Sequence, residues 1–350
     1  MILYFSRNPD YSNNAVYIKG LKRIGQQVIA DRMSFWECLR FIYANWKKVK
    51  TVVVEPDRPG AVIGFKIFTG KIIVYNALCS VYERLIVSRA LAGRFSLKAL
   101  YYWLVDFFSA HLADTVMLES KQQIKYFCRL FKVAEQKCLL SYTGADQEKF
   151  FWDENIIKRE KFTVVFRGRF LPESGAEVVV RAAKLLESED VDFLLLGSGV
   201  NLSKVEGLIK ELSPKHLRLI ADRLPIEQLR QTMQSAHLSL GQLSDHPRLE
   251  RTIPHKCFES LAVKTAYLTG RGKAVSELLS EGQTCLVCNP GDAKDLAEKI
   301  MWAKNHKSEL ARIAESGFQF FQANLTEEKL AANLLAGLRT KKIVLTSAVF

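Results

Sequence analysis

The sequence lacks any unbroken run of about eighteen apolar residues, so no segment is expected to cross a membrane as a helix. Its first residues, MILYFSRNPD, show no basic region followed by an apolar one, and we expect no signal peptide. It also lacks the G-x-x-x-x-G-K-[ST] pattern, which excludes a P-loop nucleotide site. What remains is 350 residues, 48% apolar and 25% charged, which is an ordinary globular composition with room for two domains.

The sequence also gives little support for disulfide bonds or a metal site. The seven cysteines are odd in number and scattered, which favours reduced thiols and a cytoplasmic location. Cys285 and Cys288 form a C-x-x-C, but they lie in a run typical of a buried strand, with no second cysteine pair or paired histidines to complete a zinc site. Asp190 and Asp192 form a D-x-D that precedes a predicted strand, the wrong end of a sheet for a ligand. We therefore expect no metal and no cofactor.

The charge is high and uneven. The formal net charge is +13; residues 1–150 carry 22 basic and 12 acidic residues (+10), and the rest carry 28 and 25 (+3). A basic first half indicates an anionic partner such as nucleic acid, a phospholipid surface or a phosphorylated substrate. A solvated basic surface is the alternative. No nucleic-acid-binding module is recognisable, so we expect no nucleic acid partner.

Short apolar runs alternate with helical patterns along the whole chain. The expected strands are Ile2–Phe5, Gln27–Ala30, Thr51–Glu55, Lys71–Tyr75, Thr115–Leu118, Lys137–Leu140, Phe162–Phe166, Phe193–Leu196, Leu217–Ile220, His237–Leu240, Ala266–Thr269 and Cys285–Cys288. Strands that are apolar throughout are buried on both faces, and alternation with helices makes parallel βαβ units. The sequence therefore predicts two doubly wound α/β domains, 1–155 and 156–325. We expect the helix and tail of 326–350 to pack back on the first.

Glycine-bearing turns follow strands of the second half. They are Phe166–Arg169, Gly197–Gly199 and Gly270–Lys273. Glycine lets the backbone approach a phosphate, and a helix N-terminus supplies free N–H groups. Arg169, Arg271 and Lys273 add full charges to such sites. Leu202 occupies the position of a third glycine, so the Gly197 turn is no dinucleotide fingerprint.

The stretch RTIPHKCFESLA, residues 251–262, is the most informative. Ile253-Pro254 predicts a helix start, and Lys256 and Glu259 share a face near it. There a cation can meet a diphosphate and a carboxylate can accept hydrogen bonds from sugar hydroxyls. On spacing alone, a surface Lys–Glu pair is the favoured alternative.

These motifs together resemble the donor-binding half of retaining glycosyltransferases of the family-4 type (glycosyl transferases group 1). That family has a strand ending in G-R, another ending in G-x-G, a helix carrying I-P-x-K-x-x-E-x-x-A in one branch, a later E-L, and D-G-x-x-x-L-V-x-P-G-D. The counterparts here are Gly168-Arg169, Gly197-Ser198-Gly199, Ile253–Ala262, Glu277-Leu278 and Glu281–Asp292. Order and spacing match over roughly residues 160–340.

The resemblance implies the GT-B fold, two Rossmann-like domains facing a cleft, with an N-terminal acceptor domain and a C-terminal nucleotide-sugar domain. It implies that Glu259 holds the donor ribose and that Arg169 and Lys256 neutralise the diphosphate. The other implied donor-site residues are Gly168, Gly197, Ser198, Asp222, Arg223, Leu224, Glu250, Arg251 and Glu277. The implied reaction moves a sugar from a UDP- or GDP-sugar to a glycan or lipid-linked acceptor, with retention, in cell-surface polysaccharide synthesis.

Two alternatives stay open. One is a sugar-nucleotide epimerase or hydrolase of the same fold. The other is a non-catalytic GT-B subunit that binds donor or partner without turnover, because Arg251 stands where the family has the first glutamate of E-x7-E.

The segment Arg84–His111 combines basic residues with the apolar run ALYYWLVDFF. Its length fits a helical hairpin, either a buried core element or one that lies on an anionic bilayer. The second interpretation makes the protein peripheral at the inner face of the membrane.

Overall fold

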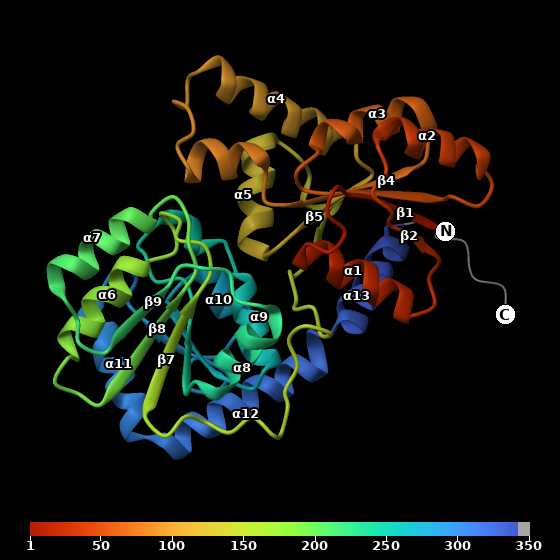
Figure 1. The fold of residues 1–350 in the computed structure, drawn as a ribbon. Coiled ribbons are helices and arrows are strands. Elements are labelled where there is room, and N and C mark those ends of the chain that lie inside the picture. The colour runs from red at the N-terminus through yellow and green to blue at the C-terminus, as the bar shows by residue number, and fades with distance from the viewer. Residues whose placement is uncertain (342–350) are drawn as a thin grey trace. The chain divides into compact units, whose positions relative to one another are not determined.

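The computed structural model describes residues 1–341 and divides the chain into two compact units. Unit 1 comprises Met1–Gly144 together with the described residues from Thr326 to 341, and unit 2 comprises Ala145–Leu325 (Figure 1). The last part of the expected C-terminal segment, from residue 342, lies outside the described residues.

The division falls earlier than the predicted boundary at residue 155 because the charged joining segment belongs to unit 2. The ring of Phe151 lies 4.0 Å from the guanidinium carbon of Arg230, and the Trp152 ring centroid is 6.0 Å from that of Phe318. These aromatic contacts tie a stretch that looks like a polar linker to the second unit.

Unit 1 is a six-stranded parallel sheet in the order β2-β1-β3-β4-β5-β6. Its strands are β1 (Ile2–Phe5), β2 (Val28–Ile29), β3 (Thr51–Val54), β4 (Ile72–Leu78), β5 (Thr115–Leu118) and β6 (Cys138–Leu140). The strand order reverses between β1 and β3, and ligands of open α/β sheets sit at the carboxyl ends of the strands at such a point.

Six α-helices and two short helical turns belong to the described part of unit 1. They are α1 (Ser12–Arg23), α2 (Phe35–Ala44), α3 (Pro59–Thr69), the π-helix η1 (Glu83–Ser88), α4 (Leu97–Leu112), α5 (Lys121–Phe131), the 3₁₀ turn η2 (Glu135–Lys137) and α13 (Glu327–Thr340). The expected hairpin of residues 84–111 thus consists of η1, a connecting loop and the single helix α4.

Helix α13 returns from the end of unit 2 to pack on α1 (Figure 1). Gly20 permits the approach: a Cβ atom there would lie 2.1 Å from the carbonyl oxygen of Glu327. The Arg23 guanidinium pairs with the Glu327 carboxylate at 2.8 Å. The two segments are therefore part of one folded unit although nearly the whole chain separates them.

Unit 2 is a second six-stranded parallel sheet, in the order β12-β11-β10-β7-β8-β9. Its strands are β7 (Phe162–Arg167), β8 (Val191–Leu196), β9 (Leu217–Ile220), β10 (Leu238–Leu240), β11 (Ala266–Gly270) and β12 (Leu286–Cys288). Its helices are α6 (Ala176–Leu185), α7 (Leu202–Leu212), α8 (Ile226–Ser235), the 3₁₀ turn η3 (Pro247–Glu250), α9 (His255–Ala262), α10 (Lys273–Leu278), α11 (Ala293–Asn305) and α12 (Lys307–Asn324). Here the order reverses between β7 and β10, so this pair marks the expected ligand edge.

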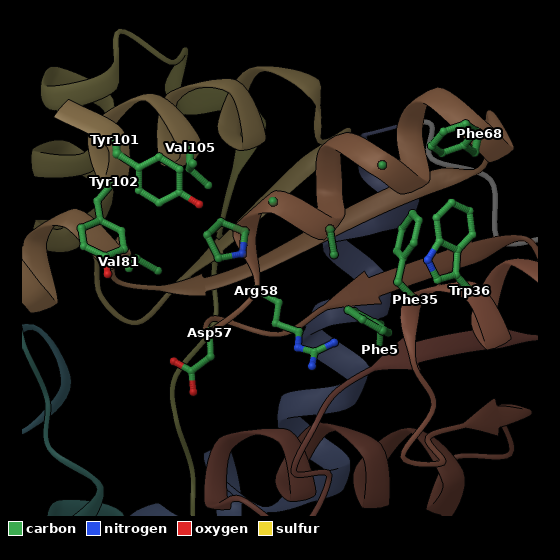
Figure 2. Close-up of a pocket in the computed structure, with 14 residues that line it drawn as sticks. Phe5, Phe35, Trp36, Asp57, Arg58, Phe68, Val81, Tyr101, Tyr102 and Val105 are labelled. Carbon is green, nitrogen blue, oxygen red and sulfur yellow. The ribbon is translucent and has the colours of Figure 1, made fainter. Parts of the chain in front are cut away.

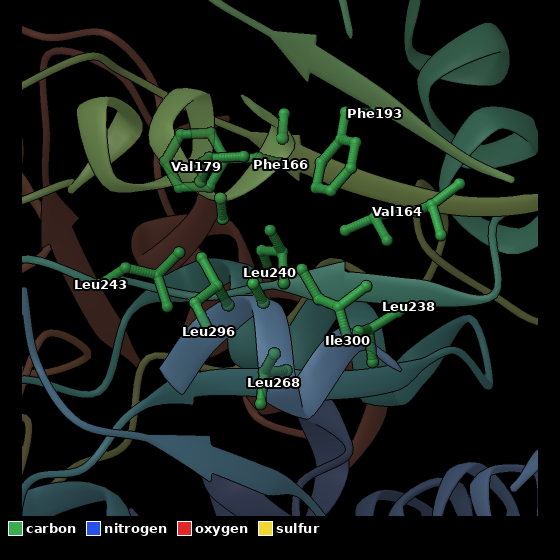
Figure 3. Close-up of a cluster of buried hydrophobic side chains, with 14 of the residues drawn as sticks. Val164, Phe166, Val179, Phe193, Leu238, Leu240, Leu243, Leu268, Leu296 and Ile300 are labelled. Carbon is green, nitrogen blue, oxygen red and sulfur yellow. The ribbon is translucent and has the colours of Figure 1, made fainter. Parts of the chain in front are cut away.

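A continuous apolar core holds unit 2 together (Figure 3). Val164, Phe166, Leu240 and Leu268 project from three neighbouring strands, and Ile300 of α11 packs against them. Burying side chains of this size stabilises the fold by roughly 1.5–3 kcal/mol each relative to exposure. The core thereby fixes the relative positions of β7 and β10, which carry the candidate site.

Among the described residues, no helix has both the length and the apolar character needed to traverse a bilayer. Within the same residues, no three His, Cys, Asp or Glu side chains cluster as metal ligands. Asp190 and Asp192 of the D-x-D instead both pair with Lys161, at 3.1 and 2.8 Å.

Candidate functional site

Two glycine turns stack at the carboxyl ends of β7 and β8. Gly168 has φ 134° and Gly197 has φ 139°, a region that favours glycine. A Cβ atom on Gly197 would lie 1.9 Å from the Gly168 carbonyl oxygen. Backbone bonds complete the arrangement: the Gly168 N–H donates to Leu196 at 2.9 Å, and the Phe170 N–H donates to Ser198 at 2.9 Å. The close backbone packing requires glycine at position 197.

Lys256 of α9 extends beneath the first of these turns. Its Nζ donates to the Gly241 carbonyl at 3.2 Å and lies 3.9 Å from the centroid of the Phe166 ring. A Cβ on Gly168 would be 3.6 Å from the same Nζ. Phe166 ends the buried part of β7 and Gly241 follows β10, so the buried amine lies at the point where the strand order reverses.

Glu259, one turn further along α9, forms an ion pair with Arg167, the last residue of β7. Both side chains are largely removed from solvent, with 17% exposure for Arg167 and 5% for Glu259. The Arg167 guanidinium also faces the ring of Phe150, 5.4 Å from its centroid. The ion pair therefore connects β7, the first strand of unit 2, to α9.

Two basic side chains, Lys256 and Arg167, share this cluster with one acidic side chain, Glu259, and burial makes their charged forms costly. Burial, followed by the charge of Arg167, holds the pKa of Lys256 well below its usual value. Burial lowers the pKa of Arg167 to about 10, and burial with Arg167 lowers the pKa of His255 to about 4. An anion bound here would offset this cost, because it would favour the charged forms of Lys256 and Arg167. A phosphate or diphosphate is an anion of the kind that would do so.

The family resemblance implies that Arg169 and Lys256 neutralise the diphosphate, and Arg167 is not among the expected site residues. In the structure Arg169 is exposed on the Gly168 turn, whereas Arg167 pairs with Glu259. The available signal was the position of Arg167 as the one charged residue, at the end, of a mainly apolar strand. The pairing itself depends on α9, which lies far along the chain.

The other expected donor-site residues follow neighbouring strands of the same sheet. Ser198 is exposed in the turn after β8, and Asp222 and Arg223 are exposed in the loop after β9. Leu224 is half-buried against a small apolar cluster that includes Leu196. All four residues therefore follow the carboxyl ends of β8 and β9, beside the Gly168 turn at the end of β7.

A second group gathers where η3 meets α10. Glu250 pairs with Lys273 at 3.7 Å, and the Arg251 guanidinium donates to the Pro247 carbonyl at 3.3 Å. Glu277 is half-buried near the end of α10. Arg271, in the same region, donates two hydrogen bonds to the Glu281 carboxylate, at 2.8 and 3.2 Å. Two expected phosphate ligands, Lys273 and Arg271, thus already have acidic partners.

The fold and the glycine-rich, cationic strand ends define the class: two Rossmann-like units of the GT-B type. The model of the family described as "Glycosyl transferases group 1" matches residues 146–320. The chain belongs to the glycosyl transferases group 1 family.

One curated protein and several solved structures are similar to this chain. A protein of Methanocaldococcus jannaschii named "Uncharacterized glycosyltransferase MJ1178" is 21% identical over 240 residues; the match covers 68% of this chain and only 60% of that relative's length. Sucrose-phosphate synthase from Thermosynechococcus elongatus matches with a TM-score of 0.75 at 15% identity, covering 97% of this chain and 98% of that one. HepE from Anabaena, solved in complex with UDP, matches with a TM-score of 0.72 at 14% identity, covering 97% and 99%. At such identities the two structures share the fold.

Proposed function

We propose that the protein is a glycosyltransferase that moves a sugar from a UDP- or GDP-sugar to a glycan or lipid-linked acceptor, with retention at the anomeric carbon, in the synthesis of a cell-surface polysaccharide. The observation that carries the proposal is the cluster of the buried Lys256 and Glu259 with the largely covered Arg167 at the β7/β10 strand ends. HepE, of the same fold, has also been solved with UDP-glucose, which supports a nucleotide-sugar donor.

In this proposal the protein acts mainly by electrostatic stabilisation and positioning. Departure of the nucleoside diphosphate leaves positive charge on the sugar and puts negative charge on the leaving group. Lys256 and Arg169 neutralise the diphosphate, and Arg167 adds a third positive charge beside them. Glu259 holds Arg167 in place and accepts hydrogen bonds from the ribose. Because side chains supply the positive charge at the diphosphate, we expect turnover without a cofactor or a divalent metal.

The remaining expected donor residues complete the proposed site. Asp222, Arg223 and Leu224 lie beside the base; Gly168, Gly197 and Ser198 line the diphosphate; Glu250, Arg251 and Glu277 lie near the sugar. Unit 1 binds the acceptor.

The test compares Lys256→Ala and Glu259→Ala with a control pair of the same spacing. Lys184 and Glu187 lie on the surface of unit 2, with Nζ and Oε2 2.7 Å apart. We expect each site variant to reduce binding of UDP or GDP and sugar transfer at least tenfold, and Lys184→Ala and Glu187→Ala to leave both unchanged. Unchanged nucleotide binding in both site variants would reject the assignment.

The same assay separates the alternatives. Nucleotide binding without any turnover indicates a non-catalytic subunit. Conversion of the nucleotide sugar without an acceptor indicates an epimerase or hydrolase. A thermal-shift comparison of UDP, GDP, ADP and CMP identifies the donor class.

We also propose that unit 1 places the protein on the inner face of the cytoplasmic membrane. Helix α4 exposes apolar side chains, and Arg94 and Lys98 beside them are exposed cations. We expect flotation with anionic vesicles that weakens as salt rises, because the attraction is screened. Equal flotation with neutral vesicles at every salt concentration would contradict this.

A further inference from the structure

Unit 1 contains a cavity of about 700 Å³ at the carboxyl ends of its first strands (Figure 2). Phe5 ends β1, and Asp57 and Arg58 follow β3, so the cavity adjoins the point where the strand order reverses. Its volume lies within the range of small-molecule sites, roughly 300–1,000 Å³. No residue of the proposed donor site lines it.

The walls are mainly aromatic. Phe35, Trp36 and Phe68 stand on one side and Tyr101 and Tyr102 on the other, with the start of α3 between them (Figure 2). The Ser34 capping box begins α2 at Phe35, which places Phe35 and Trp36 in its first turn. Such walls favour an aliphatic chain or a ring system over a bare sugar.

Glycine keeps the cavity open along α3. A Cβ on Gly64 would lie 2.6 Å from the Phe35 ring, so that ring packs directly on the helix backbone. Gly60 lines the cavity, and nothing lies within 4 Å of where its Cβ would be. A larger side chain at Gly60 would therefore fill the cavity without a clash at its Cβ.

Positive charge lies at the strand-end side of this apolar space. The Arg58 guanidinium carbon is 5.0 Å from the centroid of Phe5, and its one ion pair among the described residues is a long 3.9 Å approach to Glu55. Asp57 is paired with Arg84 at 2.5 Å. An apolar cavity with a weakly engaged guanidinium at one end fits a ligand that is apolar along its length and anionic at its head.

The cavity opens onto an apolar surface. Leu97, Leu100, Leu104 and Phe108 recur at helical spacing on α4 and are exposed, and Tyr101, on the same face, also lines the cavity. Tyr101 is 61% exposed, so it belongs both to the cavity and to the outer face. The cavity and the apolar face of α4 therefore adjoin at Tyr101.

We propose that the cavity binds the aliphatic chain of a lipid phosphate, with the phosphate at Arg58, and that this lipid is the acceptor or carries it. The acceptor role rests on the proposed glycosyltransferase function. The binding of a lipid phosphate rests on the cavity alone. Together they narrow the acceptor from a glycan or lipid-linked molecule to a lipid-linked one.

The test measures binding directly by calorimetry with farnesyl phosphate below its critical micelle concentration. Gly60→Phe should weaken binding at least tenfold, because the ring occupies the cavity. Gly207→Phe is the matched control, since Gly207 is also a helical glycine with open space at its Cβ, on α7 of unit 2. It should bind as the wild type does.

Arg58→Gln tests the head group. We expect this substitution to lower the affinity for farnesyl phosphate at least tenfold. The affinity for farnesol, the uncharged alcohol, should stay unchanged. Equal affinity of the wild type for the two compounds would overturn the assignment of a phosphate. If Gly60→Phe and the wild type bound farnesyl phosphate with equal affinity, the cavity would not be the binding site. Association of the protein with itself that Gly60→Phe abolishes would make the cavity an interface between copies and would also overturn it.

UDP or GDP binding to the same variants keeps the two proposals separate. It should persist in all of them, because unit 2 is unchanged. A variant that loses farnesyl phosphate binding and keeps nucleotide binding supports the cavity assignment and leaves the proposed donor site unaffected. Absence of nucleotide binding in the wild type, with farnesyl phosphate still bound, would overturn the proposed function and leave the cavity assignment standing.

Discussion

Arg167 at the end of β7 and Glu259 in α9 form an ion pair that is largely removed from solvent, at the carboxyl ends of the central strands of the unit 2 sheet. Removing one partner of such a pair leaves the other charge buried without compensation. Glu259→Gln should therefore lower the free energy of unfolding by roughly 2–4 kcal/mol, and the double variant Arg167→Met/Glu259→Gln should recover part of the loss. Urea denaturation followed by circular dichroism measures both.

Glu187→Gln is the control for this change. Its partner Lys184 is 39% exposed, so the loss should be below about 1 kcal/mol. Equal losses for Glu259→Gln and Glu187→Gln would contradict a buried pair.

Donor binding should depend on pH through Lys256. Burial holds the pKa of this amine well below its usual 10.5, so the amine loses its proton as pH rises through that lowered value. We expect the affinity for the nucleotide sugar to fall over the same range, and binding to take up protons, because the diphosphate favours the charged amine. Calorimetry with UDP-glucose, or with a GDP-sugar if GDP is the base, in two buffers of different ionisation enthalpy measures the uptake.

Lys256→Met should abolish the buffer dependence, and Lys184→Met should keep it. A binding enthalpy of the wild type that is identical in both buffers would show that Lys256 does not change protonation on binding.

The same lysine should reduce stability. Because its pKa in the folded protein is lower than in the unfolded chain, the unfolded chain binds more protons between the lowered value and 10.5. The contribution of Lys256 to stability therefore rises with pH across that window. Lys256→Met should raise the free energy of unfolding by about 1 kcal/mol at neutral pH, with the gain fading as pH approaches 10.5. A variant less stable than the wild type throughout this range would contradict this.

Two glycine substitutions should have opposite effects. Gly197→Ala places a methyl group 1.9 Å from the Gly168 carbonyl oxygen at φ 139°, so we expect a loss of roughly 3 kcal/mol and weaker nucleotide binding. Gly207→Ala lies in α7 with open space around the new atom and should gain about 0.5–1 kcal/mol. Thermal unfolding with and without nucleotide measures both effects. If Gly197→Ala were as stable as the wild type, the close stacking of the two glycine turns would be wrong.

Much of the fold follows from local sequence. All twelve expected strands are present among the described residues. Most of them stand out from the helices because strands buried on both faces are apolar throughout. The exception is β9, where Arg218 is exposed and the other residues are half-buried. Their ends were less predictable: β4 continues to Leu78, where side-chain pattern alone gives no signal. The order of the strands in each sheet could not be predicted from local pattern, because it depends on the side to which each connecting helix carries the chain.

The site was predictable only in part. Local sequence located Lys256 and Glu259 on one helix and a glycine turn after β7, because glycine, proline and charge patterns act over a few residues. That Glu259 meets Arg167, that Lys273 and Arg271 meet acidic partners, and that aromatic residues of α2, α3 and α4 enclose a cavity were decided by tertiary packing. The Arg167–Glu259 pair joins residues that are far apart in the chain, and even Arg271 and Glu281, which are 10 positions apart, are brought together only by the fold. Neither an ion pair nor a cavity leaves a signal in the local sequence.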